Sequence, residues 1–223
     1  MNELRQDETL LIGSRNAIET LEQKDKARVL VASDSHGADA VVTSILREQG
    51  PQSDALVFCG DGIGDLCRIF SQTFENPILA SLLPPVIAMV EGNCDANSYN
   101  VALPGNTQLT IPLIQTINIC GHKIFLTHGH RFSLYNGTDV LLQEAQRHEA
   151  EAVLYGHTHI ATAQNHGALL ALNPGSCTNP RAGQPPSYAV LQVSKGSPIT
   201  EYTFYKITGN ESVPFVPEPL MFF

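Results

Sequence analysis

The sequence Ser33-Asp34-Ser35-His36-Gly37 follows directly after the apolar run Val29-Leu30-Val31-Ala32. Four later segments repeat this arrangement, in which metal-binding residue types stand just after an apolar run of strand character. They are Cys59-Gly60-Asp61-Gly62, Glu91-Gly92-Asn93-Cys94-Asp95, Thr127-His128-Gly129-His130 and Tyr155-Gly156-His157-Thr158-His159. Ligands of open α/β sheets gather at the carboxyl ends of the strands, so we expect these five segments to meet at one edge.

The composition is that of a globular protein. Of the 223 residues, 43% are hydrophobic and 16% are charged, which argues against disorder, and the length suits one domain. The net charge of −9 argues against binding of bulk nucleic acid, which requires Lys and Arg to neutralise phosphates. No apolar run approaches the ~20 residues that span a membrane, and the first residues do not resemble a signal peptide. We therefore expect a cytoplasmic protein that does not associate with membranes.

The five cysteines are widely spaced and include no CxxC pair. This pattern favours free thiols in a reducing compartment over a disulfide framework.

The apolar patterns predict an α/β fold. Buried strands are expected at 29–32, 55–59 and 86–90, with helices at about 40–49 and 64–74 between them. Alternating residues from Thr107 onward, with a turn at Cys120-Gly121, predict a hairpin that leads to His128. A helix is expected at 139–147, capped by Thr138 and packed through Val140, Leu141 and Ala145. Further strands are expected at 152–155, 160–164, 168–172, 187–194 and 200–206.

The two ends of the chain differ from its centre. Residues 1–27 form an N-terminal extension, for which we expect a frayed end and one short helix over about 15–24 that Ser14 caps. Residues 28–207 form the domain itself. Residues 208–223 form a Pro-rich tail that ends in Met221-Phe222-Phe223, and we expect this tail to lie on the surface or to dock on a partner.

Seven residues in the five segments are candidate metal ligands. Carboxylate oxygen and imidazole nitrogen suit Mn, Fe, Co, Ni or Zn, and the lack of thiolates at these positions argues against a structural zinc site. Two ions ~3.5–4 Å apart require a bridging anion, and we assign that role to Asp61. The candidate ligands are Asp34, His36, Asp61, Asn93, His128, His157 and His159.

The order of the five segments resembles the calcineurin-like metallophosphoesterase superfamily, whose pattern is D-x-H, G-D, G-N-[H/C]-[D/E], H and G-H-x-H. The resemblance covers about residues 28–207 and implies a four-layer α-β-β-α sandwich of two mixed sheets flanked by helices. It also implies two divalent ions, with manganese preferred to Ni, Co, Fe or Zn. A hydroxide activated by these ions would attack phosphorus.

The resemblance assigns a role to each ligand. Asp34, His36, Asp61 and His159 would hold one ion, and Asp61, Asn93, His128 and His157 would hold the other. Asn93 and His128 would also be catalytic.

One position departs from many members of the superfamily. They carry histidine after the asparagine, where it is thought to protonate the leaving group, whereas this chain has Cys94. A thiol is a poorer proton donor in this role. The GNCD form resembles small phosphodiesterases related to the retromer subunit, which implies small phosphodiesters as substrates. Cys94 and His130 are the candidate substrate-binding residues. Asp95 is a candidate catalytic residue, as a replacement proton donor, although an orienting role fits it better.

Two other functions use the same fold. The first is a protein-interaction scaffold with an idle metal centre, similar to the retromer subunit. Such a protein would be expected to have lost some of the metal ligands. The second is a DNA exonuclease, which the acidic balance and the lack of a basic groove argue against. The sequence is compatible with a homo-oligomer.

Overall fold

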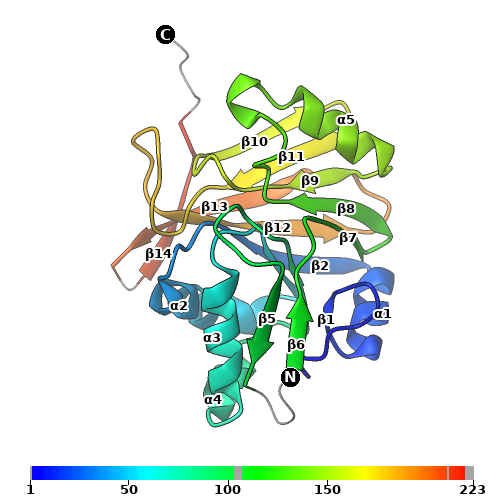
Figure 1. Cartoon of the computed structure of the whole chain (residues 1–223). Helices are drawn as coiled ribbons and strands as arrows, with labels where there is room; N and C mark the ends of the chain where they lie inside the picture. The colour runs from blue at the N-terminus through cyan, green and yellow to red at the C-terminus, as the bar shows by residue number, and fades with distance from the viewer. Residues whose placement is uncertain (1, 103–106, 210, 219–223) are drawn as a thin grey trace.

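The protein is described by a computed structural model that covers residues 2–102, 107–209 and 211–218. Its layers are stacked in Figure 1 as helix α5, a five-stranded sheet, a seven-stranded sheet, and helices α2 and α3. The four-layer α-β-β-α sandwich implied by the sequence is therefore confirmed. The helices are α1 (Arg15–Gln23), α2 (Asp39–Gln49), α3 (Ile63–Thr73), α4 (Pro77–Ser81) and α5 (Asp139–Arg147), with 3-10 turns η1 (Gly50–Gln52) and η2 (Leu134–Asn136).

The larger sheet is mixed. Strands β2, β3 and β4 run parallel, and β1, β12, β13 and β14 extend the sheet with antiparallel pairs. Its order is β1 (Ile12–Gly13), β4 (Val86–Met89), β3 (Ala55–Phe58), β2 (Lys26–Ala32), β12 (Ser187–Ser194), β13 (Glu201–Thr208) and β14 (Glu211–Phe215).

The smaller sheet is also mixed, because β8, β9 and β11 run parallel while β7 and β10 pair antiparallel at its edges. Its order is β10 (Ala161–His166), β11 (Leu169–Pro174), β9 (Ala152–Leu154), β8 (His122–Thr127) and β7 (Ile114–Ile119). The expected turn at Cys120-Gly121 joins β7 to β8, with Ile119 opposite His122.

Three clusters of buried side chains hold the layers together. The central one lies between the two sheets and includes Val31, Val57 and Leu154. The second packs α2 and α3 on the outer face of the larger sheet, and the third packs α5 on the smaller sheet. Burial of apolar surface on both faces explains why the strands read as continuous apolar runs.

Some expectations about local structure are wrong. Residues 107–110 form β6 (Thr107–Thr110), which pairs with the unexpected strand β5 (Ser98–Val101) in a separate ribbon. Thr138 makes no side-chain capping bond to α5, and Val140 is 57% exposed because it lies on the outer face of that helix. The inward residues of α5 are Leu141, Leu142 and Ala145.

The N-terminal residues are not frayed. The buried Asn2 side chain donates to the carbonyls of Pro84 and Pro85 at 2.8 and 3.1 Å, and β1 pairs with β4. Helix α1 follows, and the Ser14 hydroxyl accepts from the Ala17 N–H at 3.1 Å. The segment is fixed because its backbone groups extend the sheet.

The expected tail is in part a strand. Residues 211–215 form β14 on β13, and Glu48 accepts from the Ser212 N–H at 3.0 Å and from its hydroxyl at 2.6 Å. The apolar end Met221-Phe222-Phe223 lies outside the described residues. None of the described helices is long and apolar enough to cross a membrane.

Candidate metal centre

The five segments meet because parallel strands of both sheets end at one edge. In the larger sheet, Ala32 pairs in register with Phe58, and Phe58 pairs with Met89, so β2, β3 and β4 end level. In the smaller sheet, Leu126 pairs with Leu154. The next residues of all five strands are therefore delivered to the same place, as the sequence predicted.

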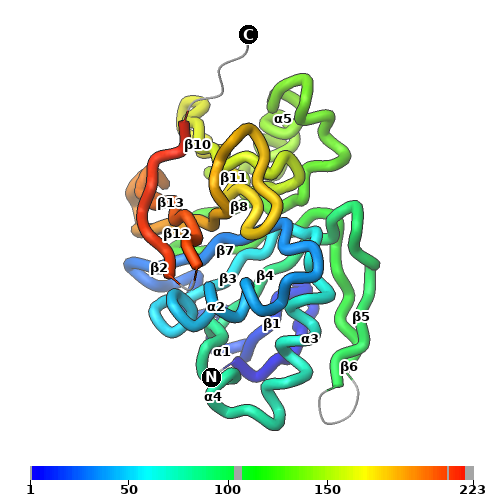
Figure 2. The backbone as a smooth tube through the Cα atoms, turned by 90° about the vertical axis from the view of Figure 1, so that its left-hand side faces the viewer, coloured from blue at the N-terminus to red at the C-terminus, as the bar shows by residue number. Residues whose placement is uncertain are grey.

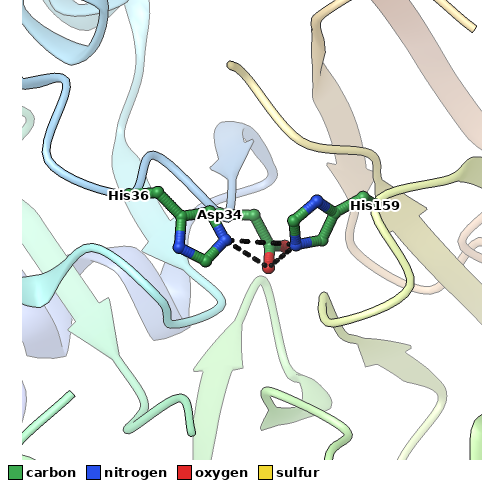
Figure 3. Close-up of side chains that lie close together, drawn as sticks. All are labelled: Asp34, His36 and His159. Carbon is green, nitrogen blue, oxygen red and sulfur yellow. Dashed lines mark hydrogen bonds and ion pairs between the residues drawn. The ribbon is translucent and has the colours of Figure 1, made fainter. Parts of the chain in front are cut away.

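The first set of donors contains Asp34, His36 and His159, whose side chains point toward one another in Figure 3. His159 Nε2 lies 3.0 Å from Asp34 Oδ1, and His36 Nε2 lies 3.9 Å from the same oxygen. The two Nε2 atoms are 3.1 Å apart. Asp34 is fully buried, so its charge is shielded from bulk water.

The second set is built on Asp61. His128 Nε2 lies 3.5 Å from Asp61 Oδ2 and 3.2 Å from Asn93 Oδ1. Asp61 Oδ2 also lies 3.8 Å from His36 Nε2. Asp61 thus stands between the two sets, the position that a bridging carboxylate requires.

Two histidines are fixed in the tautomer that favours metal binding. His128 Nδ1 donates to the Cys59 carbonyl at 2.7 Å, and His159 Nδ1 donates to the Asn179 carbonyl at 2.6 Å. Because a carbonyl only accepts, the proton is on Nδ1, and the Nε2 lone pair of the neutral ring faces the centre.

His157 and His130 lie beside this set. The His157 ring centroid is 5.1 Å from that of His128, and its backbone N–H donates to Asp34 Oδ2 at 3.2 Å. His157 belongs to none of the three Asp, His and Cys groups that come together among the described residues. The His130 ring is 5.5 Å from His128, and its Nδ1 is buried without a hydrogen-bond partner in the described part of the chain.

Asp95 has an orienting position. Its carboxylate accepts from the backbone N–H groups of Asp61 at 2.6 Å, Gly62 at 3.1 Å, Ile63 at 2.9 Å and Gly92 at 3.0 Å. It therefore caps the start of α3 and ties this loop to the GNCD loop. A carboxylate occupied in this way does not support the catalytic role predicted for Asp95.

Cys94 combines a structural backbone with an exposed side chain. Its N–H donates to Asp61 Oδ1 at 2.7 Å, and its thiol accepts from the Asn93 amide at 3.3 Å. Burial raises the pKa of the Cys94 thiol, and the hydrogen bond and negative charge of Asp61 add to the increase. The thiol is accordingly a weak acid here.

The backbone is strained at five candidate ligands. Asp34, His36, Asp61, His157 and His159 have φ values of +57°, +46°, +54°, +68° and +59°. Non-glycine residues rarely adopt this left-handed conformation, and such strain is concentrated at functional sites.

Glycines leave room for the carboxylates. A Cβ at Gly92 would lie 2.1 Å from Asp61 Oδ1, and a Cβ at Gly156 would lie 2.8 Å from Asp34 Oδ2. Both positions therefore require glycine if the carboxylates are to keep their places.

Residues outside the set of candidate ligands support the loop after β2. The Ser33 hydroxyl donates to Asp34 Oδ2 at 2.5 Å, and the Ser176 hydroxyl donates to the Asp34 carbonyl at 2.7 Å. Asp65 accepts from the Ser35 hydroxyl, and from the Gly37 N–H at 3.0 Å. These partners come from distant segments, and Ser and Asp are too common to mark such roles in a sequence.

The carboxylates and imidazoles of the centre shift one another's pKa values. Burial alone would raise the pKa of Asp61, but the hydrogen bond and charge of His128 outweigh it, and the pKa lies far below the usual value. The hydrogen bond to Asp34 is the main reason that the pKa of His159 is raised. Burial, and then the charge of His128, lowers the pKa values of His130 and His157.

The donor set fits a metal ion. Asp34 Oδ1 is buried and has no hydrogen-bond donor among the described residues, and the lone pair of neutral His159 faces it at 3.0 Å. Two acceptors so close repel each other unless a cation lies between or beside them. A proton on His159 or a divalent cation satisfies both, and oxygen with imidazole suits the latter.

Two mixed sheets with Asp and His donors at their shared edge define a metallophosphoesterase type of protein. A family model described as the calcineurin-like phosphoesterase superfamily domain matches residues 28–196. The chain belongs to this superfamily.

Curated relatives agree with this assignment. The chain is 28% identical over 184 residues to the probable metallophosphoesterase YsnB of Bacillus subtilis, which covers 82% of the chain and 93% of that protein. It is 31% identical over 170 residues to phosphodiesterase YfcE of Escherichia coli K12, which covers 74% and 86%.

Solved structures show the same fold. A predicted phosphoesterase from Streptococcus pneumoniae TIGR4 is 26% identical, with a TM-score of 0.59 over 86% of this chain and 98% of that chain. Vacuolar protein sorting 29 from Cryptosporidium parvum is 19% identical, with a TM-score of 0.62 over 86% and 97%.

Substitution of Gly92 by alanine will weaken metal binding. The new Cβ would also lie 2.4 Å from the Asp61 nitrogen, so Asp61 or the GNCD loop must shift. We expect metal affinity to fall by about tenfold or more, the size of effect seen when support of a ligand is lost. Isothermal titration with Mn²⁺ measures it. Gly64→Ala is the matched control, because its Cβ meets only Tyr99 Cε1 at 3.7 Å and Arg68 Nη1 at 3.8 Å. Equal metal affinities in the two variants would contradict the view that Gly92 leaves the room that Asp61 needs.

Without metal, the contribution of the His159–Asp34 pair to stability will fall as the pH rises through neutrality. The raised pKa of His159 means that its pair with Asp34 stabilises the fold fully below the unfolded pKa of about 6.5, and that this contribution is lost as the pH rises through the higher pKa of the folded state. Thermal unfolding of the chelator-treated protein at several pH values measures the loss. His159→Gln should flatten the dependence, and added Mn²⁺ should stabilise more at higher pH because metal competes with protons. An unchanged slope in His159→Gln would contradict this account.

Proposed function

We propose that this protein hydrolyses small phosphodiesters with two divalent metal ions, and that manganese is the preferred metal. The observation that carries the proposal is the overlap of two donor groups, Asp34 with His36 and His159, and Asp34 with Asp61 and His128. Asn93 lies within reach of His128, and His157 packs against its ring, so both are available to complete the second group.

Bound ions would act as Lewis acids on the phosphoryl oxygens and would lower the pKa of a water molecule toward neutrality. The protein contributes buried carboxylates and oriented imidazole rings to this site. Asp34 and Asp61 would hold the positive charge of the ions, while the carbonyls of Cys59 and Asn179 keep the imidazole rings of His128 and His159 aimed inward. Ligands fixed in this way lose little freedom when substrate binds.

The preference for diesters rests on position 94. The exposed Cys94 stands next to Asp61, where an imidazole would be a better acid for a leaving alkoxide, and the carboxylate of Asp95, which accepts from backbone N–H groups, does not replace it. Substrates with good leaving groups need less protonation. The name of the relative YfcE supports diester hydrolysis.

The alternative is a protein-interaction scaffold that uses the same fold. The likeness to vacuolar protein sorting 29 favours it, although at 19% identity this likeness concerns the fold alone. The presence of all seven candidate ligands favours the enzyme. The five free cysteines suit the reducing cytoplasm in which we place the protein.

Loss of either central ligand will abolish turnover. We expect Asp61→Asn and His128→Ala to remove metal-dependent hydrolysis of bis-p-nitrophenyl phosphate, because each belongs to the second donor set. Initial rates with Mn, Ni, Co, Zn and Mg measure this and identify the preferred metal. Asp25→Asn and His148→Ala are the controls, since Asp25 is exposed and His148 lies against Phe125 behind the smaller sheet. Unchanged rates in either central variant would overturn the site assignment.

Histidine at position 94 will extend the activity to monoesters. We expect Cys94→His to raise the hydrolysis of p-nitrophenyl phosphate by about tenfold or more, since a placed general acid contributes a factor of this size or larger. Cys94→Ser tests whether loss of the thiol alone has the same effect. If monoester hydrolysis does not rise in Cys94→His, the missing proton donor does not set the preference.

A further inference from the structure

A large groove lies beside the metal centre, at the open edge between the two sheets. Its volume is about 1190 Å³, which is generous for a small-molecule site. Figure 2 looks onto this side of the molecule, where β10, β13 and the chain after β14 run. The walls come from η2, the turn after β9, β10, β13 and residues 214–218.

The groove is mostly apolar and aromatic. Phe204 packs against Tyr202 and Phe215 with ring centroids 5.7 and 6.2 Å apart, and Val216 is 89% exposed along the wall. The described lining contains no Lys or Arg, and Glu218 is its one carboxylate. Asn136, Gln164 and several threonines provide neutral hydrogen-bonding groups. Such walls attract an uncharged aromatic group and disfavour a second anionic one.

The groove lies next to the candidate metal centre, and Tyr135 stands between the two. This residue lines the groove, and its ring contacts that of His157 edge-on with centroids 5.7 Å apart. Its hydroxyl accepts from Arg181 Nη1 at 2.5 Å, while the Arg181 N–H donates to the His159 carbonyl at 3.0 Å. Thr158, between the two candidate ligands His157 and His159, also lines the groove. A molecule held by its phosphate at the centre could therefore extend one arm past Tyr135.

From this geometry we infer that the groove binds one organic arm of the diester, and that this arm is uncharged and aromatic, as in an aryl ester or a nucleoside. The inference rests on the proposed phosphodiesterase function. Tyr135 is the wall that the arm passes, and Phe215 and Val216 form the far side. A diester with a small aliphatic arm leaves the groove empty and gains nothing from it.

The test keeps the leaving group constant and changes the other arm. Bis-p-nitrophenyl phosphate, the p-nitrophenyl ester of thymidine 5′-phosphate and methyl p-nitrophenyl phosphate all release p-nitrophenol. We expect KM for the two aromatic arms to be lower than for the methyl arm by about tenfold, the effect of burying part of a ring. Competitive inhibition by diphenyl phosphate against dimethyl phosphate gives the same comparison without turnover.

Val216→Asp places a charge on the exposed wall and should raise KM for the aromatic arms about fivefold or more, while kcat/KM for the methyl ester stays unchanged. Val213→Asp is the matched control, because Val213 is an exposed valine of β14 outside the groove lining. Phe215→Ala is a second variant that removes an aromatic wall. A selective loss with either aryl or nucleoside esters supports the groove and identifies the arm it prefers.

Two outcomes separate the groove from the activity. Hydrolysis of all three esters with equal KM values, unaffected by Val216→Asp and Phe215→Ala, would overturn the groove and leave the phosphodiesterase intact. No metal-dependent hydrolysis of any ester would overturn the phosphodiesterase itself. A greater preference for an arm that carries an additional phosphate would also contradict the inference.

Discussion

The candidate metal centre depends on the packing of two sheets through their apolar inner faces. Residues such as Val31, Val57 and Leu154 bury the two sheets against each other and fix their relative position. The parallel strands of each sheet end in register. The loops that follow β2, β3, β4, β8 and β9 therefore converge at one edge. Two buried carboxylates then face imidazole nitrogens, 3.0 Å apart for Asp34 and His159, a contact that a shared proton or a cation relieves. The hydrophobic core thus stabilises an arrangement of charges that would be unfavourable by itself.

The sequence was most informative where burial is strongest. The strands 29–32, 55–59 and 86–90 and the helices between them were predictable, since apolar runs and helical periodicity report burial directly. It was less informative where pairing between distant segments determines whether a strand forms. The pairing of β5 with β6 and of β14 with β13 depends on partners that no local pattern shows, and β1 contains only two residues.

The same distinction holds at the site. The positions of Asp34, Asp61 and His128 followed from their places after strands, because topology alone brings strand ends together. For Asp95 the sequence favoured an orienting role, but the partners of its carboxylate could not be predicted, since they are four backbone N–H groups from two loops. Tyr135 and Arg181 were equally hidden, because they reach the centre from a 3-10 turn and a loop whose sequences carry no regular pattern.

At position 94 the backbone has a structural role, whereas the side chain is the part that would meet the substrate. The Cys94 backbone holds Asp61, which any amino acid other than proline could do, and the exposed thiol lies beside the donor atoms of His36 and Asp61. Natural variation at this position can therefore change the acid that meets the substrate without rebuilding the loop that supports the carboxylate. If the proposed role of position 94 holds, replacement of this one side chain changes the ester class while the loop that supports Asp61 stays as it is.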